Sequence, residues 1–192
     1  MTSRTHDLFA FASLISVATY YPPVSINAST MIISTIGCVI GSLLPDIDQE
    51  SNKLWDLLPV GHFLGSFLKN IFLAHRTLSH SIIGIIAFYE AFNWLLPKIL
   101  NSNSIHIHAV FVALMVGYIS HLVADSLTEE GIPLFFPFKF KIGFPPIKAL
   151  RIRTGSFVEK YIFFPSILIY IIWFVSSNDQ KILEIIKLAI KS

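Results

Sequence analysis

The sequence predicts an all-α membrane protein, a polytopic helical bundle of about five transmembrane helices plus an interfacial helix. Hydrophobic residues make up 54% of the 192 residues and charged residues only 14%, whereas a soluble domain carries about 25% charged residues. The hydrophobic residues also fall into long runs instead of recurring at the spacings of a core-facing surface. Such runs indicate that lipid is the solvent. The length fits a single membrane-embedded domain over residues 1–192.

Five apolar stretches come close to the length that a membrane requires. A helix needs around 20 residues to cross a hydrocarbon core about 30 Å thick, and shorter helices cross where flanking residues snorkel. The five stretches are residues 8–21, 29–44, 81–96, 106–123 and 161–176. A weaker stretch at 59–73 is interrupted by glycines, a histidine and a lysine. We expect it to form an interfacial or cytoplasmic helix and not a span.

The first stretch also has features of a secretory signal, since Ser16-Val17-Ala18 resembles a cleavage site. Its N-terminal flank carries one Arg and one Asp instead of a positive excess, and the run continues into Tyr20 and Tyr21. Aromatic residues of this kind anchor a helix at a membrane interface. We therefore expect a span here.

The placement of Lys and Arg predicts the orientation, because positively charged loops stay on the cytoplasmic side. With the N-terminus inside, segments 1–7, 45–80 and 124–160 are cytoplasmic and carry ten of these residues, and the external segments carry four. We therefore expect a cytoplasmic N-terminus and an external C-terminus. The tail, 178–192, argues against this, because its apolar residues have helical spacing and it would lie flat on a membrane surface, usually the anionic inner one.

Several function classes are disfavoured by the composition. The net charge is only +2 and no run is both long and basic, so we expect no direct nucleic-acid binding. Cys38 is the single cysteine, which excludes an intramolecular disulfide and a cysteine-based zinc site. We expect it to be a packing residue. Residues 126–158 are expected to form a surface loop against the membrane, because 131–146 is rich in Pro, Phe and Gly.

The first chemical motif is Asp46-Ile47-Asp48, which follows Pro45 at the end of the second apolar stretch. Carboxylates near hydrocarbon are costly, so they are expected to be paired, bound to a metal or placed at the water boundary. A helix end with two solvated acids is the simpler alternative.

The second motif comes directly before the third stretch and contains His75 and His80. Residues five apart point about 140° apart on one helix, so the two side chains converge only if the chain turns between them. Ser79 is a plausible N-cap of a helix that starts at His80, with Thr77 as the second choice. Two unconnected interfacial histidines are the alternative.

The third motif ends the fourth stretch and contains His121 and Asp125. Residues four apart share one helical face, so both side chains reach a common point, which Thr128 can also join. Imidazole nitrogen and carboxylate oxygen suit Zn²⁺, Mn²⁺ or Fe²⁺. The alternative is a hydrogen-bonded His/Asp pair.

All three motifs fall on the cytoplasmic side of a topology that rests on Lys and Arg alone. His6 and Glu159 also lie at cytoplasmic span ends. The combined set is large enough to hold one or two metals. His106 and His108 fall on the other side and His62 has no acid at helical spacing, so we expect these three to be structural.

At these residues the sequence resembles the family of LexA-binding, inner-membrane-associated hydrolases, also described as predicted membrane-bound metal-dependent hydrolases. The shared blocks, in order, are Thr5-His6, Leu-Leu-Pro-Asp-Ile-Asp (43–48), His-Arg-x-x-x-His-Ser (75–81), Gly-Tyr-x-x-His-x-x-Ala-Asp-x-x-Thr-x-x-Gly (117–131) and Thr-Gly-Ser-x-x-Glu (154–159). Each block is weak alone, but the ordered set is fairly specific. Ala74 stands where a common form of the third block has Gly. The resemblance implies a multi-pass protein of the bacterial inner membrane with metal-dependent hydrolase activity.

The leading hypothesis is metal-assisted hydrolysis at the cytoplasmic interface, where a divalent metal lowers the pKa of bound water and polarises the scissile group. Zinc is the preferred cofactor, with manganese or iron as alternatives. The expected ligands are Asp46, Asp48, His75, His80, His121 and Asp125, with His6 a weaker candidate. Glu159 is expected to be a general base or to orient a ligand. Arg76 and Arg153 are expected to neutralise an anionic substrate.

The position of the site at headgroup level favours a membrane lipid or a lipid-linked phosphoester as substrate. One rival is a non-catalytic regulator or scaffold that binds a soluble protein through the basic loop 139–153. Another is a metal or ion transporter, which requires polar residues deep within several spans. Only Glu90 and Asn93 lie inside one.

Overall fold

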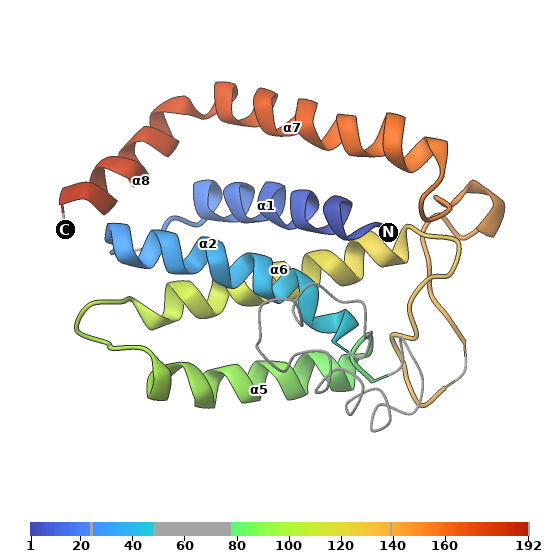
Figure 1. Ribbon diagram of the computed structural model, residues 1–192, viewed down its shortest axis with the longest axis horizontal. Helices are drawn as coiled ribbons and strands as arrows, with labels where there is room; N and C mark the ends of the chain where they lie inside the picture. Colours follow the sequence, from blue (N-terminus) through green and yellow to red (C-terminus); the bar gives the residue numbers. More distant parts are fainter. Residues whose placement is uncertain (24, 48–77, 139, 192) are drawn as a thin grey trace, which may run out of the picture.

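The computed structural model describes residues 1–23, 25–47, 78–138 and 140–191, and helices dominate these ranges (Figure 1). The long helices are α1 (Ser3–Tyr20), α2 (Ala28–Leu43), α5 (Ile82–Ile99), α6 (Ile107–Ser126), α7 (Phe164–Ser177) and α8 (Asp179–Lys191). Short helical turns are η1 (Leu44–Asp46), η2 (Lys148–Leu150) and the π-helical η3 (Glu159–Phe163). Within the described ranges no strand forms, and two isolated bridges join residues of the loop 127–152. The prediction of an all-α membrane bundle is confirmed.

Four helical segments are long and apolar enough to cross a membrane. They are Ala28–Asp46, Ile82–Ile99, Ile107–Ser126 and Glu159–Ser177. The first expected span differs, because α1 is not among these four and begins at Ser3, ahead of the expected start at residue 8. Its first turns carry Arg4, His6 and Asp7, which lower its apolar character. The interfacial helix expected at 59–73 lies outside the described residues.

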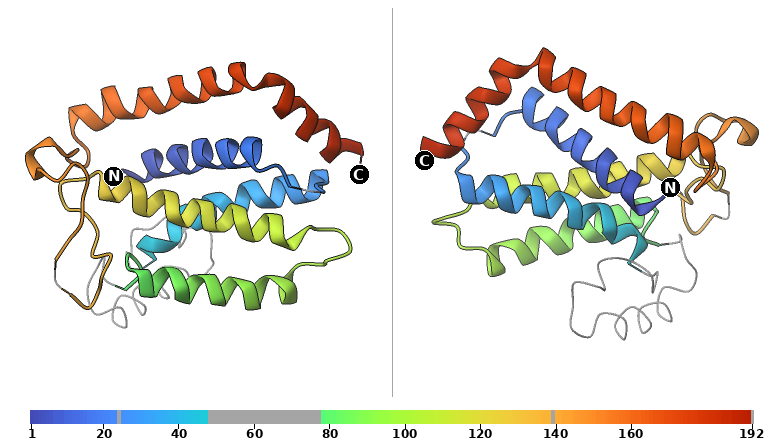
Figure 2. Two further views of the ribbon diagram at one scale, coloured as in Figure 1. Left: turned by 180° about the vertical axis from the view of Figure 1, so that it is seen from behind. Right: turned by 45° about the horizontal axis from the view of Figure 1, so that its top comes forward.

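The helices stack in the order α7, α1, the pair α2 and α6, and α5 (Figures 1 and 2). The pair α2 and α6 makes the most extensive contact, and α1 packs on both of its members. One buried cluster contains Leu44, Leu114, Tyr118, Leu122 and Ile132. A second contains Ala10, Cys38 and Ala113, and the Cys38 thiol donates to the Ala10 carbonyl. The core therefore follows the pair α2 and α6, with α5 packed on the first cluster and α1 on the second.

Two glycines allow α2 and α6 to approach closely. A Cβ at Gly41 would lie 2.1 Å from the carbonyl oxygen of Leu114, and a Cβ at Gly117 would lie 2.0 Å from that of Cys38. Any side chain at either position would force the backbones apart. Small residues at helix contacts are typical of membrane bundles, where close van der Waals packing drives association.

The outer helices α5 and α7 expose large apolar side chains. Ile86, Trp94, Ile169, Ile172 and Trp173 are all exposed. Exposed apolar side chains of this kind on each helix are unfavourable in water and favourable against lipid. On α5 the two polar residues Glu90 and Asn93 are also exposed, so they do not point into the bundle.

Helix α5 starts two residues later than expected. Its N-cap is Ser81, whose hydroxyl accepts a hydrogen bond from the Gly84 amide at 3.2 Å, and the helix begins at Ile82. The expectation of Ser79 as N-cap with His80 in the first turn is therefore wrong. Ser79 and His80 belong to the preceding turn, where the His80 side chain is fully buried.

Candidate metal site

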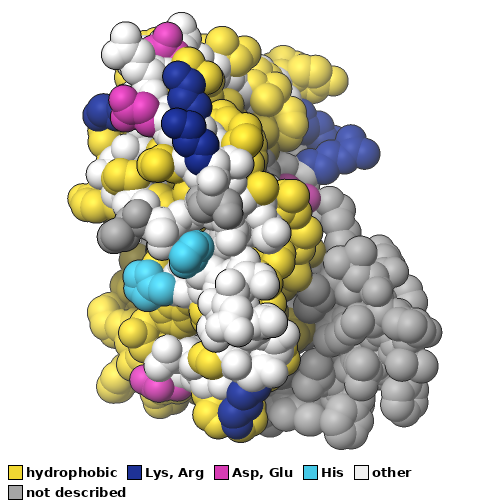
Figure 3. All heavy atoms as spheres, turned by 90° about the vertical axis from the view of Figure 1, so that its left-hand side faces the viewer, with side chains coloured by type: hydrophobic (Ala, Val, Ile, Leu, Met, Phe, Trp, Pro, Cys, Tyr) yellow, Lys and Arg dark blue, Asp and Glu magenta, His cyan; other side chains and the backbone are white. Residues whose placement is uncertain are grey.

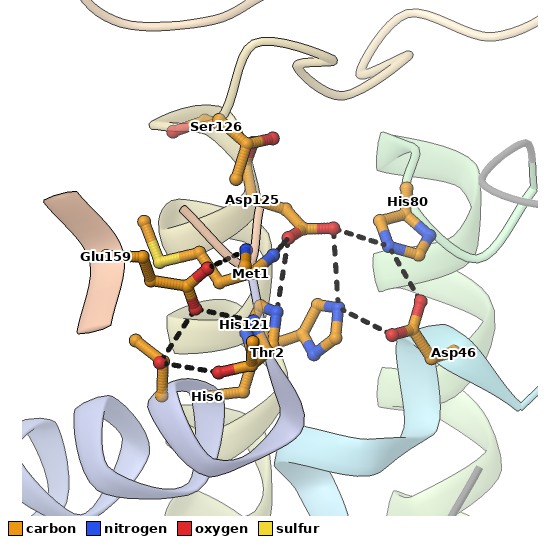
Figure 4. Close-up of polar contacts among 12 residues, drawn as sticks. Met1, Thr2, His6, Asp46, His80, His121, Asp125, Ser126 and Glu159 are labelled. Carbon is orange, nitrogen blue, oxygen red and sulfur yellow. Dashed lines mark hydrogen bonds and ion pairs between the residues drawn. The ribbon is translucent and has the colours of Figure 1, made fainter. Parts of the chain in front are cut away.

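Four side chains from three separate segments converge at one end of the bundle (Figure 4). Asp46 closes η1 at the end of α2, and His80 precedes α5. His121 and Asp125 come from the last two turns of α6, on one face as their spacing predicts. One ligand atom from each residue lies within 4.8 Å of the others, so this group could hold a metal ion.

The distances within the group fit shared coordination better than direct hydrogen bonding. His80 Nε2 lies 3.6 Å from Asp46 Oδ1 and 3.5 Å from Asp125 Oδ2. His121 Nε2 lies 3.7 Å from Asp46 Oδ2 and 3.7 Å from Asp125 Oδ2. N–H···O hydrogen bonds measure about 2.7–3.2 Å. Ligand atoms placed tetrahedrally at 2.0–2.2 Å from a zinc ion would lie about 3.3–3.6 Å apart.

The imidazole of His121 is held with Nε2 toward the group. Its Nδ1 lies 2.6 Å from the backbone carbonyl oxygen of Ser42. Because a carbonyl can only accept, Nδ1 carries the proton and Nε2 presents its lone pair. Metal-binding histidines are usually oriented in this way, by a ring N–H that donates a hydrogen bond to a carbonyl or carboxylate.

His80 is held by neighbouring groups. Its Nδ1 lies 3.1 Å from the Ser79 hydroxyl, and the Tyr118 hydroxyl donates a hydrogen bond to the Ser79 carbonyl. Burial lowers the pKa of His80 below its usual value, because an imidazolium loses its hydration there. The neutral form that results is the form that coordinates metals.

The group is buried but not sealed. The side chains of His80 and Asp125 are fully buried and that of His121 is 2% exposed, whereas that of Asp46 is 21% exposed. Access to the group is therefore from the Asp46 side. Among the described residues, Asp46 Oδ1 and His121 Nε2 are buried atoms without a hydrogen-bond partner. Such atoms are costly unless an ion or water completes them, which supports the fit to a metal.

His6 lies beside the group. Its ring stacks on that of His121 with centroids 3.8 Å apart and planes 8° apart. Its Nε2 lies 3.2 Å from Asp125 Oδ1, the oxygen that also accepts the Met1 amino group at 2.7 Å. The structure thus places the expected weaker ligand next to the four-residue group, on the other oxygen of Asp125.

Glu159 is held apart from the four-residue group by its own hydrogen bonds. Its Oε1 accepts from the Thr2 amide at 2.6 Å and the Thr5 hydroxyl at 2.8 Å. Its Oε2 accepts from the Gly155 amide at 2.6 Å. The carboxylate is completely buried. These contacts connect the N-terminus of α1 to the start of η3, an arrangement that suits positioning better than proton transfer.

The remaining expected site residues are placed as follows. Asp48, His75 and Arg76 lie outside the described residues. Arg153 is exposed in the turn that precedes Glu159. The Thr128 hydroxyl donates to the backbone carbonyl of Asp125 at 2.7 Å and so closes the end of α6.

Sequence reasoning missed the groups that orient the site. These are the Ser42 carbonyl, the Met1 amino group and the amide of Thr2. A backbone carbonyl and a chain terminus leave no mark in residue type, so no pattern could have found them. The Thr5-His6 and Thr-Gly-Ser-x-x-Glu blocks were the available signals, because Thr5, Gly155 and Glu159 are joined in the structure.

The opposite end of the bundle carries none of these residues. His106 and His108 lie at the start of α6, fifteen and thirteen residues before His121. At 1.5 Å per residue this separation is roughly 20 Å. His106 Nδ1 lies 3.2 Å from the Ser25 hydroxyl. Figure 3 shows this end, where histidine side chains lie at the surface.

The helices and the buried group define a helical membrane protein with a potential metal site. Comparison with known proteins is consistent with this class: the chain belongs to the family described as YdjM inner membrane protein, whose model matches residues 1–186. The family resemblance expected from the sequence motifs is thereby confirmed. The family description and the apolar helices support a location in the inner membrane.

Individual relatives extend the comparison. The chain is 30% identical over 164 residues to the uncharacterized protein YvsG of Bacillus subtilis, covering 84% of this chain and 87% of that protein. It is 24% identical over 154 residues to the inner membrane protein YdjM of Escherichia coli, covering 74% and 67% respectively. The YdjM protein of Shigella flexneri matches to the same extent. No solved structure matches the chain.

Proposed function

We propose that the protein is a metal-dependent hydrolase that acts at the cytoplasmic face of the inner membrane. The observation that carries the proposal is the buried group of two imidazoles and two carboxylates whose ligand atoms lie within 4.8 Å of one another. This largely buried group lies at the end of helices that are long and apolar enough to cross a membrane. Buried ionisable groups at membrane depth mark functional sites by default.

The ligand set favours zinc. Two histidine nitrogens and two carboxylate oxygens suit Zn²⁺, with Mn²⁺ and Fe²⁺ as alternatives. The proposed ligands are Asp46, His80, His121 and Asp125. His6 is proposed either as a further ligand or as a residue that holds Asp125 in position. When bound, the metal supplies a Lewis acid that polarises the scissile group and lowers the pKa of water.

The chain's own residues position the substrate and the ligands. Asp46 is the most accessible of the four ligands, so the substrate approaches from its side. Arg76 and Arg153 are proposed to neutralise an anionic substrate through charge-assisted hydrogen bonds. Glu159 is proposed to hold the N-terminus of α1 in place, which keeps His6 stacked on His121. A phosphoester in or near the lipid headgroups fits this arrangement.

The experiment is a hydrolysis assay on detergent-purified protein with bis(p-nitrophenyl) phosphate. We expect turnover that a chelator abolishes and added Zn²⁺ restores. His121→Ala should be inactive even with added metal. The paired change Lys141→Ala and Lys148→Ala should retain activity, because both residues lie outside the group.

A scaffold that binds a soluble protein through its basic loop gives the reverse result. In that case the lysine variants lose the partner, and His121→Ala keeps it. Metal-independent behaviour of the wild type together with this pattern would replace the hydrolase proposal.

A further inference from the structure

Glu90 lies deeper in a membrane-spanning segment than any other charged residue of the four segments described above. In Ala28–Asp46, Ile107–Ser126 and Glu159–Ser177, every Asp, Glu, Lys and Arg is the first or second residue from an end. Glu90 instead lies near the midpoint of α5. At 1.5 Å per residue it is about 12–14 Å from either end of the helix. A carboxyl group therefore lies near the centre of the hydrocarbon core, where it is most costly.

The Glu90 side chain points away from the bundle. The inner face of α5 is formed by Ile85, Phe88 and Phe92, which pack on the buried cluster around Tyr118. Glu90 and Asn93 are both exposed, and neither makes a hydrogen bond or ion pair with another residue that the structure describes. Helix α5 also forms one edge of the stack of described helices (Figures 1 and 2). The two polar side chains are thus presented outward at membrane depth.

These two residues belong to a stripe of exposed residues along α5. The stripe consists of Ile83, Ile86, Glu90, Asn93 and Pro97, separated in turn by three, four, three and four residues. This is the spacing of the a and d positions of a coiled coil. Helices in membrane bundles commonly cross at about 20°, the angle at which such a stripe keeps facing its partner helix. The α5 stripe therefore has the pattern of a helix–helix contact.

The polar part of the α5 stripe is complementary to itself. Two copies inserted with the same orientation carry identical residues at the same depth, so a two-fold axis along the membrane normal sets their α5 helices parallel. Glu90 and Asn93 differ in depth by about 4.5 Å, a step that the two side chains can bridge. The Asn93 amide group donates and the Glu90 carboxyl group accepts. Symmetry repeats this contact, so both side chains of both copies gain a partner.

Contact with lipid alone leaves these polar groups without partners. From the middle of α5 the Glu90 side chain is too short to reach either interface, and lipid chains offer no hydrogen bond. Polar side chains at membrane depth typically hydrogen-bond across helices. Ile83 and Ile86, which are 47% and 56% exposed, extend the contact with apolar surface on one side of the polar pair. A second copy provides the matching groups at the correct depth by symmetry.

We propose that α5 is the contact surface between two copies of this chain in the membrane, with Glu90 of each copy hydrogen-bonded to Asn93 of the other. This inference goes beyond the proposed function, because it requires neither metal nor turnover. The contact lies on the outer face of α5 and leaves the four-residue group of each copy in place. His80 directly precedes α5, so the contact also restrains the segment that carries this candidate ligand.

Cysteine cross-linking tests the contact in the full-length protein, reconstituted in phosphatidylcholine liposomes. Cys38→Ala removes the single native thiol. In this background Ile86→Cys lies on the α5 stripe, and Ala91→Cys is the matched control, exposed on the same helix but about 100° around from Glu90. On oxidation with copper phenanthroline, we expect a disulfide-linked dimer from Ile86→Cys and several-fold less from Ala91→Cys. Equal yields, or no dimer from Ile86→Cys, overturn the proposal.

Replacement of the polar pair tests its part in the contact. Glu90→Leu combined with Asn93→Leu, in the Ile86→Cys background, keeps an apolar surface and removes both hydrogen bonds. The protein density in the liposomes that gives half-maximal cross-linking should then rise at least about fivefold. Glu90→Gln keeps a hydrogen-bonding side chain and should stay near the starting density. Circular dichroism identifies any variant that fails to fold. An unchanged density for the folded leucine variant, or a rise for folded Glu90→Gln equal to that of the leucine variant, overturns the proposal.

A different membrane protein on the α5 stripe gives a different result. Ile86→Cys then stays monomeric in liposomes that contain only this chain, and in native membranes it cross-links to a chain of another mass. That pattern overturns the pairing of two copies. His121→Ala in the Ile86→Cys background should still form the cross-linked dimer, so loss of metal or hydrolysis in this variant bears on the proposed function alone.

Discussion

Asp125 contacts different partners through its two carboxylate oxygens. Its Oδ2 faces the imidazoles of His80 and His121 at 3.5 Å and 3.7 Å. Its Oδ1 faces the Met1 amino group at 2.7 Å and His6 Nε2 at 3.2 Å. A single buried charge thus links the candidate ligands to the N-terminus of α1. Loss of this carboxylate should disturb both sides, because buried charges depend on paired neighbours.

Glu159 provides a test at the same scale. In Glu159→Gln an NH₂ group replaces one of the two carboxylate oxygens. This NH₂ group then faces either the Gly155 amide or the Thr2 amide and Thr5 hydroxyl, so at least one donor loses its acceptor. We expect a loss of about 1–3 kcal/mol in unfolding free energy. Metal affinity should weaken but remain. Thermal denaturation with and without Zn²⁺ measures both effects.

Glu159→Asp is the control for this prediction, because it keeps the charge but shortens the reach. It should lose stability as well. Unchanged stability of Glu159→Gln together with abolished hydrolysis would instead identify Glu159 as a catalytic base.

At this scale, the sequence predicted contacts between residues that are close in sequence better than contacts between distant segments. The pair His121 and Asp125 follows from helical spacing alone, and α6 brings them together as expected. Asp46 and His80 required the additional argument that charge places their segments on one side. The hydrogen bonds of Glu159 depend on how α1 meets the loop before η3, which no residue spacing reveals.

At the scale of elements, the contact between α2 and α6 sets the position of the candidate ligands. Gly41 and Gly117 bring the two backbones together. Asp46 and His121 then come to lie at adjacent helix ends, and the Ser42 carbonyl of α2 orients His121 of α6. The geometry of the four-residue group therefore depends directly on the close packing of α2 against α6.

Gly117→Ala tests this dependence. The added methyl would lie 2.0 Å from the Cys38 carbonyl oxygen, so the helices must separate. We expect a loss of about 1–3 kcal/mol in stability, typical of overpacking, and a marked loss of bound metal. Gly37→Ala is the matched control on the same helix pair, since its methyl would meet only ordinary contacts at 3.7 Å. Equal metal content in the two variants would contradict the coupling.

Element boundaries were less predictable than the elements themselves. Ser79 and Ser81 both precede the apolar run of α5, and either serine is a suitable N-cap by residue type. The choice of Ser81 reflects tertiary contacts, because Ser79 is engaged with His80 and Tyr118. Position 84 also requires glycine, as a Cβ there would lie 2.2 Å from the Leu78 carbonyl oxygen.

At the scale of the whole molecule, the described residues of the candidate site gather at one end of the bundle. The ends of α2 and α6 and the starts of α1, α5 and η3 meet there, and α8 lies toward the opposite end (Figure 1). The described basic side chains of 1–7, 124–138 and 140–160 belong to the site end. The distribution of Lys and Arg therefore predicts that this end faces the cytoplasm.

Reporter fusions test this orientation. Fusions after residues 48 and 125 should both report a cytoplasmic location, and a fusion within 101–104 should report an external one. Alkaline phosphatase and green fluorescent protein give opposite signals on the two sides and control for each other. Opposite locations for the first two fusions would contradict a common site.

The fold class was predictable at this scale because composition and run length reflect the solvent directly. The number of spans was not, because α1 carries Arg4, His6 and Asp7 in its first turns. Those polar residues belong to the site end, where His6 and the neighbouring Thr2 and Thr5 make their contacts. A functional helix terminus therefore reduces the apolar signal of the helix that carries it.

The most direct test of the central claim is the metal content of folded protein after metal-replete purification. We predict about one zinc per wild-type chain, as for a single four-ligand site. His121→Ala and Asp125→Asn should contain none while still inserting into the membrane, and His108→Ala at the opposite end should match the wild type. Equal metal in the wild type and His121→Ala, or none in either protein, would contradict the account.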